Sequence, residues 1–367
     1  MRVFTRSLVA GMAVATGLAG GAVAQEAKVL NVYNWSDYIA EDTIANFEKE
    51  TGIKVNYDVY DSNEMLEAKL LAGNSGYDVI MPTSTFLARF VKGNIVQPLD
   101  KSKIPNFANL DPGLLAGLAN NDPGNAHAGI YQWGTNGLGY IPEKVTAALG
   151  ADAPVNSWDL LFKPENAAKL ASCGIYVLDS PSEIFPITMA YLGYAPDTED
   201  AEAYKKAEEL WAGIRPYITK FHSSEYINAL ANGDACVAMG FSGDVFIAAS
   251  RAEEAGKPFT VEYAIPKEGT LMWFDTLAIP ADAPHPENAH AFINYILQPE
   301  VVGAITNYVS YANAVPASKD VVDPEIWNNP AIFPTDEVKQ KLFVDKPASQ
   351  KLDRLRTRSW NKIKTGK

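Results

Sequence analysis

The chain has 367 residues, of which 47% are hydrophobic and 20% are charged. This length is too great for one ordinary hydrophobic core, and the composition favours a soluble globular protein with two lobes. The formal net charge of −13 argues against binding to nucleic acid or to anionic membrane, and it permits a cationic ligand.

The first residues have the pattern of a secretory signal peptide. Arg2 and Arg6 form a basic start, residues 8–23 form an apolar core of mostly small side chains, and Ala22-Val23-Ala24 is a cleavage site. We therefore expect residues 1–24 to be removed, which takes away two arginines and moves the net charge from −13 to −15. Because no later apolar run approaches the roughly 18 residues that cross a bilayer, the mature chain should be soluble.

A short loop after the first predicted strand carries several candidate binding residues. The pattern predicts a strand at 29–33, the loop Asn34-Trp35-Ser36-Asp37-Tyr38 and a helix at 41–50. In an open α/β sheet such a loop lies at the carboxyl edge of the strands, where ligands bind. Its rings and carboxylate suit a cation. The alternative is that the loop caps the helix while its rings fill the core.

Two further strands extend the same arrangement. Residues 53–59 alternate as a strand, Asp61 and Glu64 have capping-box spacing at the start of a helix, and residues 77–81 form a short apolar strand that ends before Thr83. This β-α-β-α-β order with short connections predicts a mostly parallel sheet. Thr83 and the first loop can then face one cleft.

The middle of the chain predicts two more strand-to-helix junctions with an acid. The run at 130–140 mixes strand formers with three glycines, which suggests close backbone approach in a crossover between lobes. A strand at 174–178 ends in Asp179-Ser180-Pro181-Ser182-Glu183. Another strand, at 236–240, ends in Phe241-Ser242-Gly243-Asp244.

The last third contains two aromatic segments and a basic end. Trp273-Phe274-Asp275 leads into the apolar run 276–279, and two predicted helices lead to Tyr311-Ala312-Asn313. The basic segment 351–367 has three apolar residues at helical spacing. We interpret it as the solvated face of a docked helix and not as a binding patch.

Acids, hydroxyls and rings thus recur at these positions. The acids are Asp37, Glu183, Asp244 and Asp275, the hydroxyls are Ser36, Tyr38, Thr83 and Tyr311, and the rings are Trp35, Phe241 and Trp273. Each residue alone is explained equally well as a helix cap or a core residue. Four acids at strand-to-helix junctions are harder to explain as caps, because a desolvated cluster of carboxylates is costly unless a cation joins it.

The chain has two cysteines, Cys173 and Cys236. In an exported protein such a pair predicts a disulfide, and the alternative is two buried free thiols. Their spacing does not suit a zinc site and the four histidines are scattered, so no metal and no other cofactor is expected.

A secreted, carboxylate-dependent glycoside hydrolase is the rival class. The sequence contains no G-x-S-x-G elbow, no H-E-x-x-H motif and no P-loop. It also does not distinguish an acid from a nucleophile among the carboxylates. A binding protein is therefore favoured over an enzyme.

Longer stretches carry a family resemblance across essentially the whole mature chain. They are YNWSDYIA, FEKETGIKV, YDSNE, FHSSEYINALANGD, IPKEG, YANA and RTRSWNKIKTGK. The sequence resembles the periplasmic polyamine-binding proteins of putrescine/spermidine ABC importers. This resemblance implies an α/β, two-lobe solute-binding fold of type II, in which each lobe is a mixed, mostly parallel sheet flanked by helices. Lobe 1 would comprise residues 27–134 and 275–312, and lobe 2 residues 135–274 and 313–367.

The resemblance also implies a ligand-binding set between the lobes. By motif it comprises Trp35, Ser36, Asp37, Tyr38, Thr83, Glu183, Phe241, Asp244, Trp273, Asp275 and Tyr311. The cysteines match the family's disulfide pair. The expected function is that of a monomeric periplasmic receptor that delivers a polyamine to an ABC importer membrane permease, without enzyme activity and without a nucleic-acid partner. A receptor for another organic cation is an alternative.

The chain departs from the family's putrescine-preferring branch at two ring positions. Phe241 stands where that branch often has tryptophan, and Trp273 where it often has phenylalanine. Because Trp273 matches a tryptophan of spermidine-preferring relatives, we expect a receptor that takes both polyamines, with spermidine at least equal to putrescine. Asp345 is either a further anionic contact or a solvated loop acid.

Overall fold

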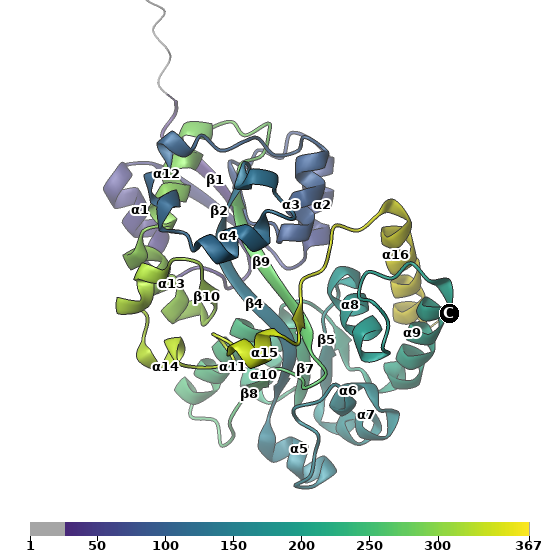
Figure 1. Ribbon diagram of the computed structural model, residues 1–367. Helices are drawn as coiled ribbons and strands as arrows, with labels where there is room; N and C mark the ends of the chain where they lie inside the picture. Colours follow the sequence, from purple (N-terminus) through teal and green to yellow (C-terminus); the bar gives the residue numbers. More distant parts are fainter. Residues whose placement is uncertain (1–25, 367) are drawn as a thin grey trace, which may run out of the picture.

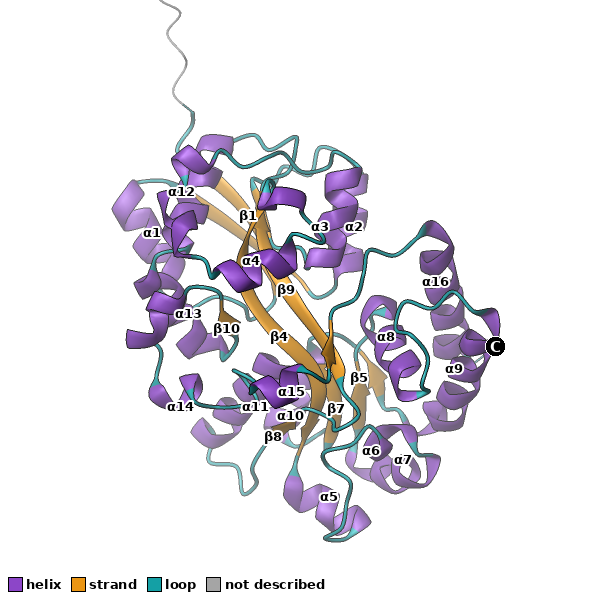
Figure 2. Cartoon of the chain, viewed as in Figure 1, coloured by secondary structure: helices purple, strands orange, loops and turns teal. Residues whose placement is uncertain are grey.

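The computed structural model describes residues 26–366 (Figure 1). The predicted signal peptide lies outside these residues. The chain forms a mixed α/β protein in which helices flank an open sheet (Figure 2), as predicted. None of the described helices is long and apolar enough to cross a membrane.

The N-terminal part forms the predicted β-α-β-α-β arrangement. Its elements are β1 (Val29–Trp35), α1 (Thr43–Thr51), β2 (Lys54–Tyr60), α2 (Asn63–Leu71), β3 (Val79–Ile80) and α3 (Ser84–Lys92). β1 pairs in parallel with β2 on one side and with β3 on the other, which confirms the predicted sheet. Leu30 and Val32 of β1 are completely buried, as expected for a central strand that helices cover.

The start of α2 differs from the prediction. Ser62, and not Asp61, is the N-cap, because its backbone is extended and its hydroxyl accepts a hydrogen bond of 3.3 Å from the Met65 N–H. Asp61 and Glu64 therefore do not form the predicted capping box, and both side chains make other contacts, described below.

Two long antiparallel strands, β4 (Ala128–Tyr140) and β9 (Thr270–Ala278), cross the middle of the molecule (Figure 1). Residues 128–135 of β4 pair with β9, and residues 136–140 pair with β7 (Val237–Phe241). β9 also pairs with β3, so the strand order is β2-β1-β3-β9-β4-β7-β5-β6. The two strands thus join a first lobe around β1–β3 to a second lobe around β5–β7.

The crossing requires a residue without a side chain. A Cβ atom on Gly134 would lie 2.9 Å from Ser242 Oγ and 2.9 Å from Trp273 Cζ2. This is the close approach that the glycines of the run had predicted. The pairing partner of β4 changes from β9 to β7 between residues 135 and 136, next to the predicted lobe boundary. The lobe boundaries themselves stay a prediction.

The second lobe repeats the parallel pattern. β5 (Ile175–Val177) pairs in parallel with β7 on one side and with β6 (Lys220–Phe221) on the other. The helices that follow these strands in the chain are α8 (Pro181–Tyr191), α9 (Ala201–Ile214), α10 (Glu225–Asn232) and α11 (Ser242–Glu254). The remaining α-helices and strands are α4 (Pro112–Leu118), α5 (Pro142–Leu149), α6 (Asp159–Phe162), α7 (Pro164–Leu170), β8 (Glu262–Ala264), α12 (Pro286–Ile296), α13 (Pro299–Val309), β10 (Ala312–Asn313), α14 (Pro324–Trp327), α15 (Asp336–Lys339), β11 (Leu342–Phe343) and α16 (Gln350–Thr365).

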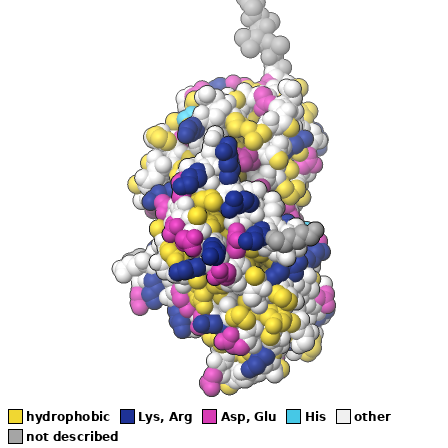
Figure 3. Space-filling view, turned by 90° about the vertical axis from the view of Figure 1, so that its right-hand side faces the viewer, with side chains coloured by type: hydrophobic (Ala, Val, Ile, Leu, Met, Phe, Trp, Pro, Cys, Tyr) yellow, Lys and Arg dark blue, Asp and Glu magenta, His cyan; other side chains and the backbone are white. Residues whose placement is uncertain are grey.

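The basic C-terminal segment forms α16, which packs against α8 and α9 of the second lobe (Figure 1). Leu352 and Trp360 are buried, and Asp179 accepts hydrogen bonds from Trp360 Nε1 (2.7 Å) and Lys364 Nζ (2.6 Å). On this side of the molecule Lys and Arg side chains lie among Asp and Glu on the surface (Figure 3). The interpretation as a docked helix with a solvated face is confirmed.

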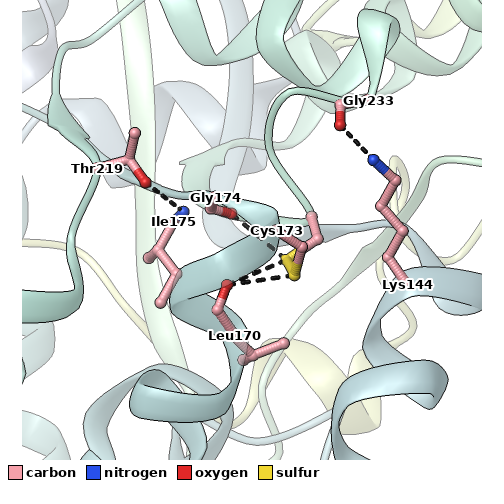
Figure 4. Close-up of a disulfide and its surroundings, with 8 residues drawn as sticks. Lys144, Leu170, Cys173, Gly174, Ile175, Thr219 and Gly233 are labelled. Carbon is pink, nitrogen blue, oxygen red and sulfur yellow. Dashed lines mark hydrogen bonds between the residues drawn. A yellow bond between two sulfur atoms is a disulfide. The ribbon is translucent and has the colours of Figure 1, made fainter.

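Cys173 and Cys236 form a disulfide (Figure 4), which confirms the predicted pairing. Cys173 precedes β5 and Cys236 precedes β7, so the bond fastens the amino ends of two neighbouring parallel strands. Ligands of such sheets bind at the carboxyl ends. The disulfide therefore lies at the opposite end of these strands from the candidate site.

Candidate functional site

A cavity lies between the lobes, at the carboxyl ends of β1, β3 and β7 and beside β9. The residues that line it are Trp35, Ser36, Tyr38, Asp61, Thr83, Glu183, Ser223, Ser224, Phe241, Asp244, Trp273, Asp275 and Tyr311. Every member of the predicted ligand-binding set except Asp37 is among them. Their contact with a ligand stays a prediction.

Asp37 does not line the cavity. It follows β1 in a left-handed backbone conformation (φ 53°), and its Oδ1 lies 2.5 Å from Arg251 Nη2 of α11 in the second lobe. The side chains of this ion pair are about one-third exposed. The structure thus gives Asp37 a protein partner across the two lobes and does not place its carboxylate against the cavity.

Asp275 lies in the middle of β9, not at a strand-to-helix junction as the sequence suggested. Its Oδ1 accepts a hydrogen bond of 2.7 Å from Thr83 Oγ1, and Asn63 Nδ2 donates in turn to Thr83 Oγ1 (2.9 Å). Burial raises the pKa of Asp275 to about 7, and the hydrogen bond from Thr83 opposes that rise.

Asp244 lies in the first turn of α11, directly after β7, as predicted. Its two carboxylate oxygens accept hydrogen bonds from Tyr226 OH (2.5 Å) and Tyr311 OH (2.8 Å). Burial raises the pKa of Asp244 to about 7, although both hydroxyls favour the ionised form. Gly243 allows this arrangement, because a Cβ atom there would lie 2.3 Å from the Tyr311 ring.

Glu183 lies in the first turn of α8 and is only 5% exposed. Burial raises its pKa to about 8, and the negative charge of Glu64 adds to the rise. The side chain of Asn136, as a hydrogen-bond donor, opposes this rise. Glu183 thus lines the cavity as a buried carboxylate.

Aromatic rings form the apolar walls between the acids. Phe241 lies edge-on to both Trp35 and Trp273, with ring centroids 6.1 and 5.8 Å away. Trp35 is held by a hydrogen bond of 2.8 Å from its Nε1 to the Met81 carbonyl. Rings of this kind exclude water, contact methylene groups and attract cations.

Three lining residues were not in the predicted set. Asp61 follows β2, so the strand-end rule could have found it, but it was interpreted as a helix cap. Ser223 and Ser224 follow β6, a strand of two residues that is too short to show a period. Asp61 Oδ2 lies 3.6 Å from His222 Nδ1, which joins the two lobes at this side of the cavity.

Asp345 is not a solvated loop acid. It is 7% exposed, and its Oδ2 pairs with Arg356 Nη1 of α16 at 2.8 Å. It lines a second, smaller space that adjoins the cavity through Thr83, Glu183 and Trp273. Whether it contacts a ligand stays a prediction.

The cavity therefore suits a cation. Asp244, Asp275 and Glu183 are buried with raised pKa values, and none of the lining residues is Lys or Arg. A cation placed between them would lower the cost of burying their charges. A two-lobe α/β protein with such a site between its lobes is a solute-binding protein.

The comparison with known proteins identifies the family. Residues 42–335 match the family model of the bacterial extracellular solute-binding proteins, and the chain belongs to this family. It is 54% identical over 367 residues, the full length of both chains, to the putrescine-binding periplasmic protein SpuD of Pseudomonas aeruginosa. It is 52% identical to the putrescine-binding periplasmic protein PotF of Escherichia coli, over 98% of this chain and 97% of that one.

Two more distant matches are also named as spermidine/putrescine-binding proteins. The spermidine/putrescine-binding periplasmic protein of Escherichia coli is 33% identical over 92% of each chain. The crystal structure of the spermidine/putrescine ABC transporter substrate-binding protein PotD of Streptococcus pneumoniae superposes with a TM-score of 0.72 at 27% identity, over 92% of this chain and 99% of that one.

Proposed function

We propose that this protein is an extracytoplasmic receptor that binds a linear polyamine between its two lobes and delivers it to the membrane permease of an ABC importer. The observation that carries this proposal is the set of three buried carboxylates in one aromatic cavity whose lining contains no basic residue. An amine with ammonium groups at both ends would neutralise these carboxylates, and its methylenes would contact the rings.

The relatives support the same ligand class and compartment. SpuD, PotF and the 33% identical protein of Escherichia coli are each named for periplasmic binding of putrescine or of spermidine and putrescine. A periplasmic location agrees with the predicted signal peptide, and we propose that the receptor acts as a monomer. The net charge of −13 disfavours a nucleic-acid partner.

The comparisons favour putrescine as a ligand. The relatives at 54% and 52% identity are named for putrescine alone, and the one named for both polyamines is 33% identical. Spermidine adds a three-carbon arm and a third nitrogen, so its binding requires more room or another acceptor. Trp273 remains the residue on which the expectation of spermidine binding depends.

The site is not that of a hydrolase in this proposal. A glycosidase needs one carboxylic acid that is protonated and a second carboxylate that stays ionised. Here the pKa values of Asp244, Asp275 and Glu183 are all raised, and burial is the largest cause for each. Similar environments do not create that division of roles.

A thermal-shift panel tests the proposal. Putrescine, spermidine, basic amino acids and sugars are each added to the mature protein at increasing concentration. A ligand at a hundredfold excess over its dissociation constant stabilises the folded state by about 2.7 kcal/mol, so a polyamine should raise the melting temperature clearly. A shift with a sugar and none with any polyamine would end the proposal, and turnover of a glycoside would favour the hydrolase.

A further inference from the structure

Glu64 connects the two lobes at one end of the cavity. It lies in the first turn of α2 in the first lobe, and its carboxylate contacts the start of α8 in the second. Oε1 accepts hydrogen bonds from Ser182 Oγ (2.9 Å) and from the Ser182 N–H (3.4 Å), and Oε2 accepts one from Ser180 Oγ (3.2 Å). Glu64 is not among the residues that line the cavity.

This contact supplies what α8 lacks in its own sequence. Ser180 occupies the N-cap position of α8, yet its side chain makes no capping hydrogen bond to the helix. The first N–H groups of a helix need acceptors, and the helix dipole favours a negative charge there. The Glu64 carboxylate, from the first lobe, supplies an acceptor and a negative charge at the start of α8.

The helix that Glu64 contacts carries a binding acid. Glu183 lies in the same first turn of α8, is 5% exposed and lines the cavity. The negative charge of Glu64 is the second cause, after burial, of the raised pKa of Glu183. Two carboxylates therefore lie near the start of α8, one on each lobe, and a ligand ammonium at Glu183 would relieve their repulsion.

We propose that Glu64 is a positioning residue that links ammonium binding at Glu183 to closure of the two lobes. This inference rests on the proposed function. When the lobes part to admit or release a ligand, α2 and α8 separate and the contact with Ser180 and Ser182 is lost. When an ammonium binds Glu183, Glu64 approaches at lower electrostatic cost, caps α8 and holds the closed form.

The inference predicts a specific change in kinetics. Glu64→Gln keeps the size and an acceptor oxygen but removes the charge. We expect putrescine to dissociate about tenfold faster from this variant, within the usual range of coupling between two sites, while the association rate changes less than about twofold. Stopped-flow fluorescence, using the tryptophans of the cavity, measures both rates. A loss of the cap alone would instead lower the melting temperature of the ligand-free protein.

Glu67→Gln is the matched control. Glu67 lies one turn further along α2 and pairs with Arg89 of α3 at 2.7 Å, within the first lobe. It loses the same charge, and putrescine should dissociate from this variant at the wild-type rate. Equal acceleration in both variants, or a wild-type dissociation rate in Glu64→Gln, would overturn the inference.

A double-mutant cycle separates positioning from general stability. If Glu64 acts through Glu183, the affinity loss in Glu64→Gln/Glu183→Gln is smaller than the two single losses combined. Additive losses would contradict the inference. If the wild-type protein itself binds neither putrescine nor spermidine, the proposed function fails, and this inference fails with it. Wild-type binding with unaltered kinetics in Glu64→Gln rejects the inference alone.

Discussion

Asp244 and Asp275 show how single residues create a demand for a cation. Each is buried, each accepts hydrogen bonds from hydroxyl groups, and the pKa of each is raised to about 7. Hydroxyl groups stabilise a carboxylate but do not neutralise it. The remaining cost of the negative charge is what a ligand ammonium can offset.

Replacing either acid by asparagine should therefore weaken polyamine binding strongly. Loss of one partner of a buried charge pair costs about 2–5 kcal/mol, and we expect Asp244→Asn and Asp275→Asn to fall in this range by calorimetry. Asp152→Asn, at an exposed acid of the second lobe, is the control and should bind as wild type does. Wild-type affinity in either cavity variant would show that the site is wrongly assigned.

Trp273 tests the choice between polyamines. It is 5% exposed, lies against Phe241 and Tyr311, and its Nε1 finds no hydrogen-bond partner in the part of the chain that the structure covers. Tryptophan is the best cation–π partner and offers more surface than phenylalanine. Trp273→Phe should therefore shift the ratio of spermidine to putrescine affinity towards putrescine, measured by competition calorimetry. An unchanged ratio would show that Trp273 does not set the preference.

Among the elements, the disulfide has a purely structural role in this account. It joins the amino ends of β5 and β7 and closes a loop of 63 positions, which is worth about 4 kcal/mol in the chain-entropy model. Cys173→Ser/Cys236→Ser should lower the midpoint of urea unfolding and leave polyamine affinity within about twofold. A large loss of affinity at a temperature where the variant is folded would link the bond to the site.

Local sequence patterns predicted the strand ends, and with them most of the cavity. Ser36, Thr83, Glu183 and Asp244 follow strands that apolar runs make visible, although β1 extends through Trp35, two residues beyond the predicted strand end. Asp275, which the resemblance placed in the binding set, lines the cavity, but its strand position was wrongly predicted, because the sequence does not reveal that β9 crosses the sheet antiparallel and passes the cavity at its middle.

Contacts between distant segments could not be predicted. Asp37 looks like a cavity residue from its loop, yet Arg251, more than 200 positions away, engages it. Asp345 looks like a surface acid, yet it is buried against Arg356. In both cases the partner comes from an element whose placement depends on the whole tertiary fold, and no local pattern encodes it.

For the whole molecule, the buried acids make stability depend on pH. In the ligand-free fold the pKa values of Asp244 and Asp275 are about 7 and that of Glu183 about 8, above their ordinary values of 3.8 and 4.5. The folded state thus binds more protons than the unfolded state between about pH 4 and pH 8, and these groups lower the free energy of unfolding as the pH rises through that window.

We therefore expect these acids to lower the melting temperature of the ligand-free protein as the pH rises from 5 to 8.5. The triple variant Asp244→Asn/Asp275→Asn/Glu183→Gln should show a smaller decline over the same range, because its three side chains do not titrate. Scanning calorimetry of both proteins checks this. Equal slopes would mean that the three acids are not buried in the free protein as the structure has them.

The central claim is that ligand ammonium groups ionise and neutralise the buried carboxylates, and proton release on binding tests it most directly. Putrescine is titrated calorimetrically at pH 7 in buffers of different ionisation enthalpy, with 1,4-butanediol as an uncharged ligand of the same length. An ammonium lowers the pKa of a neighbouring carboxyl, so putrescine should bind with net release of protons to the buffer, and the diol should not bind measurably. Putrescine binding without proton release, or diol binding of equal strength, would contradict the account.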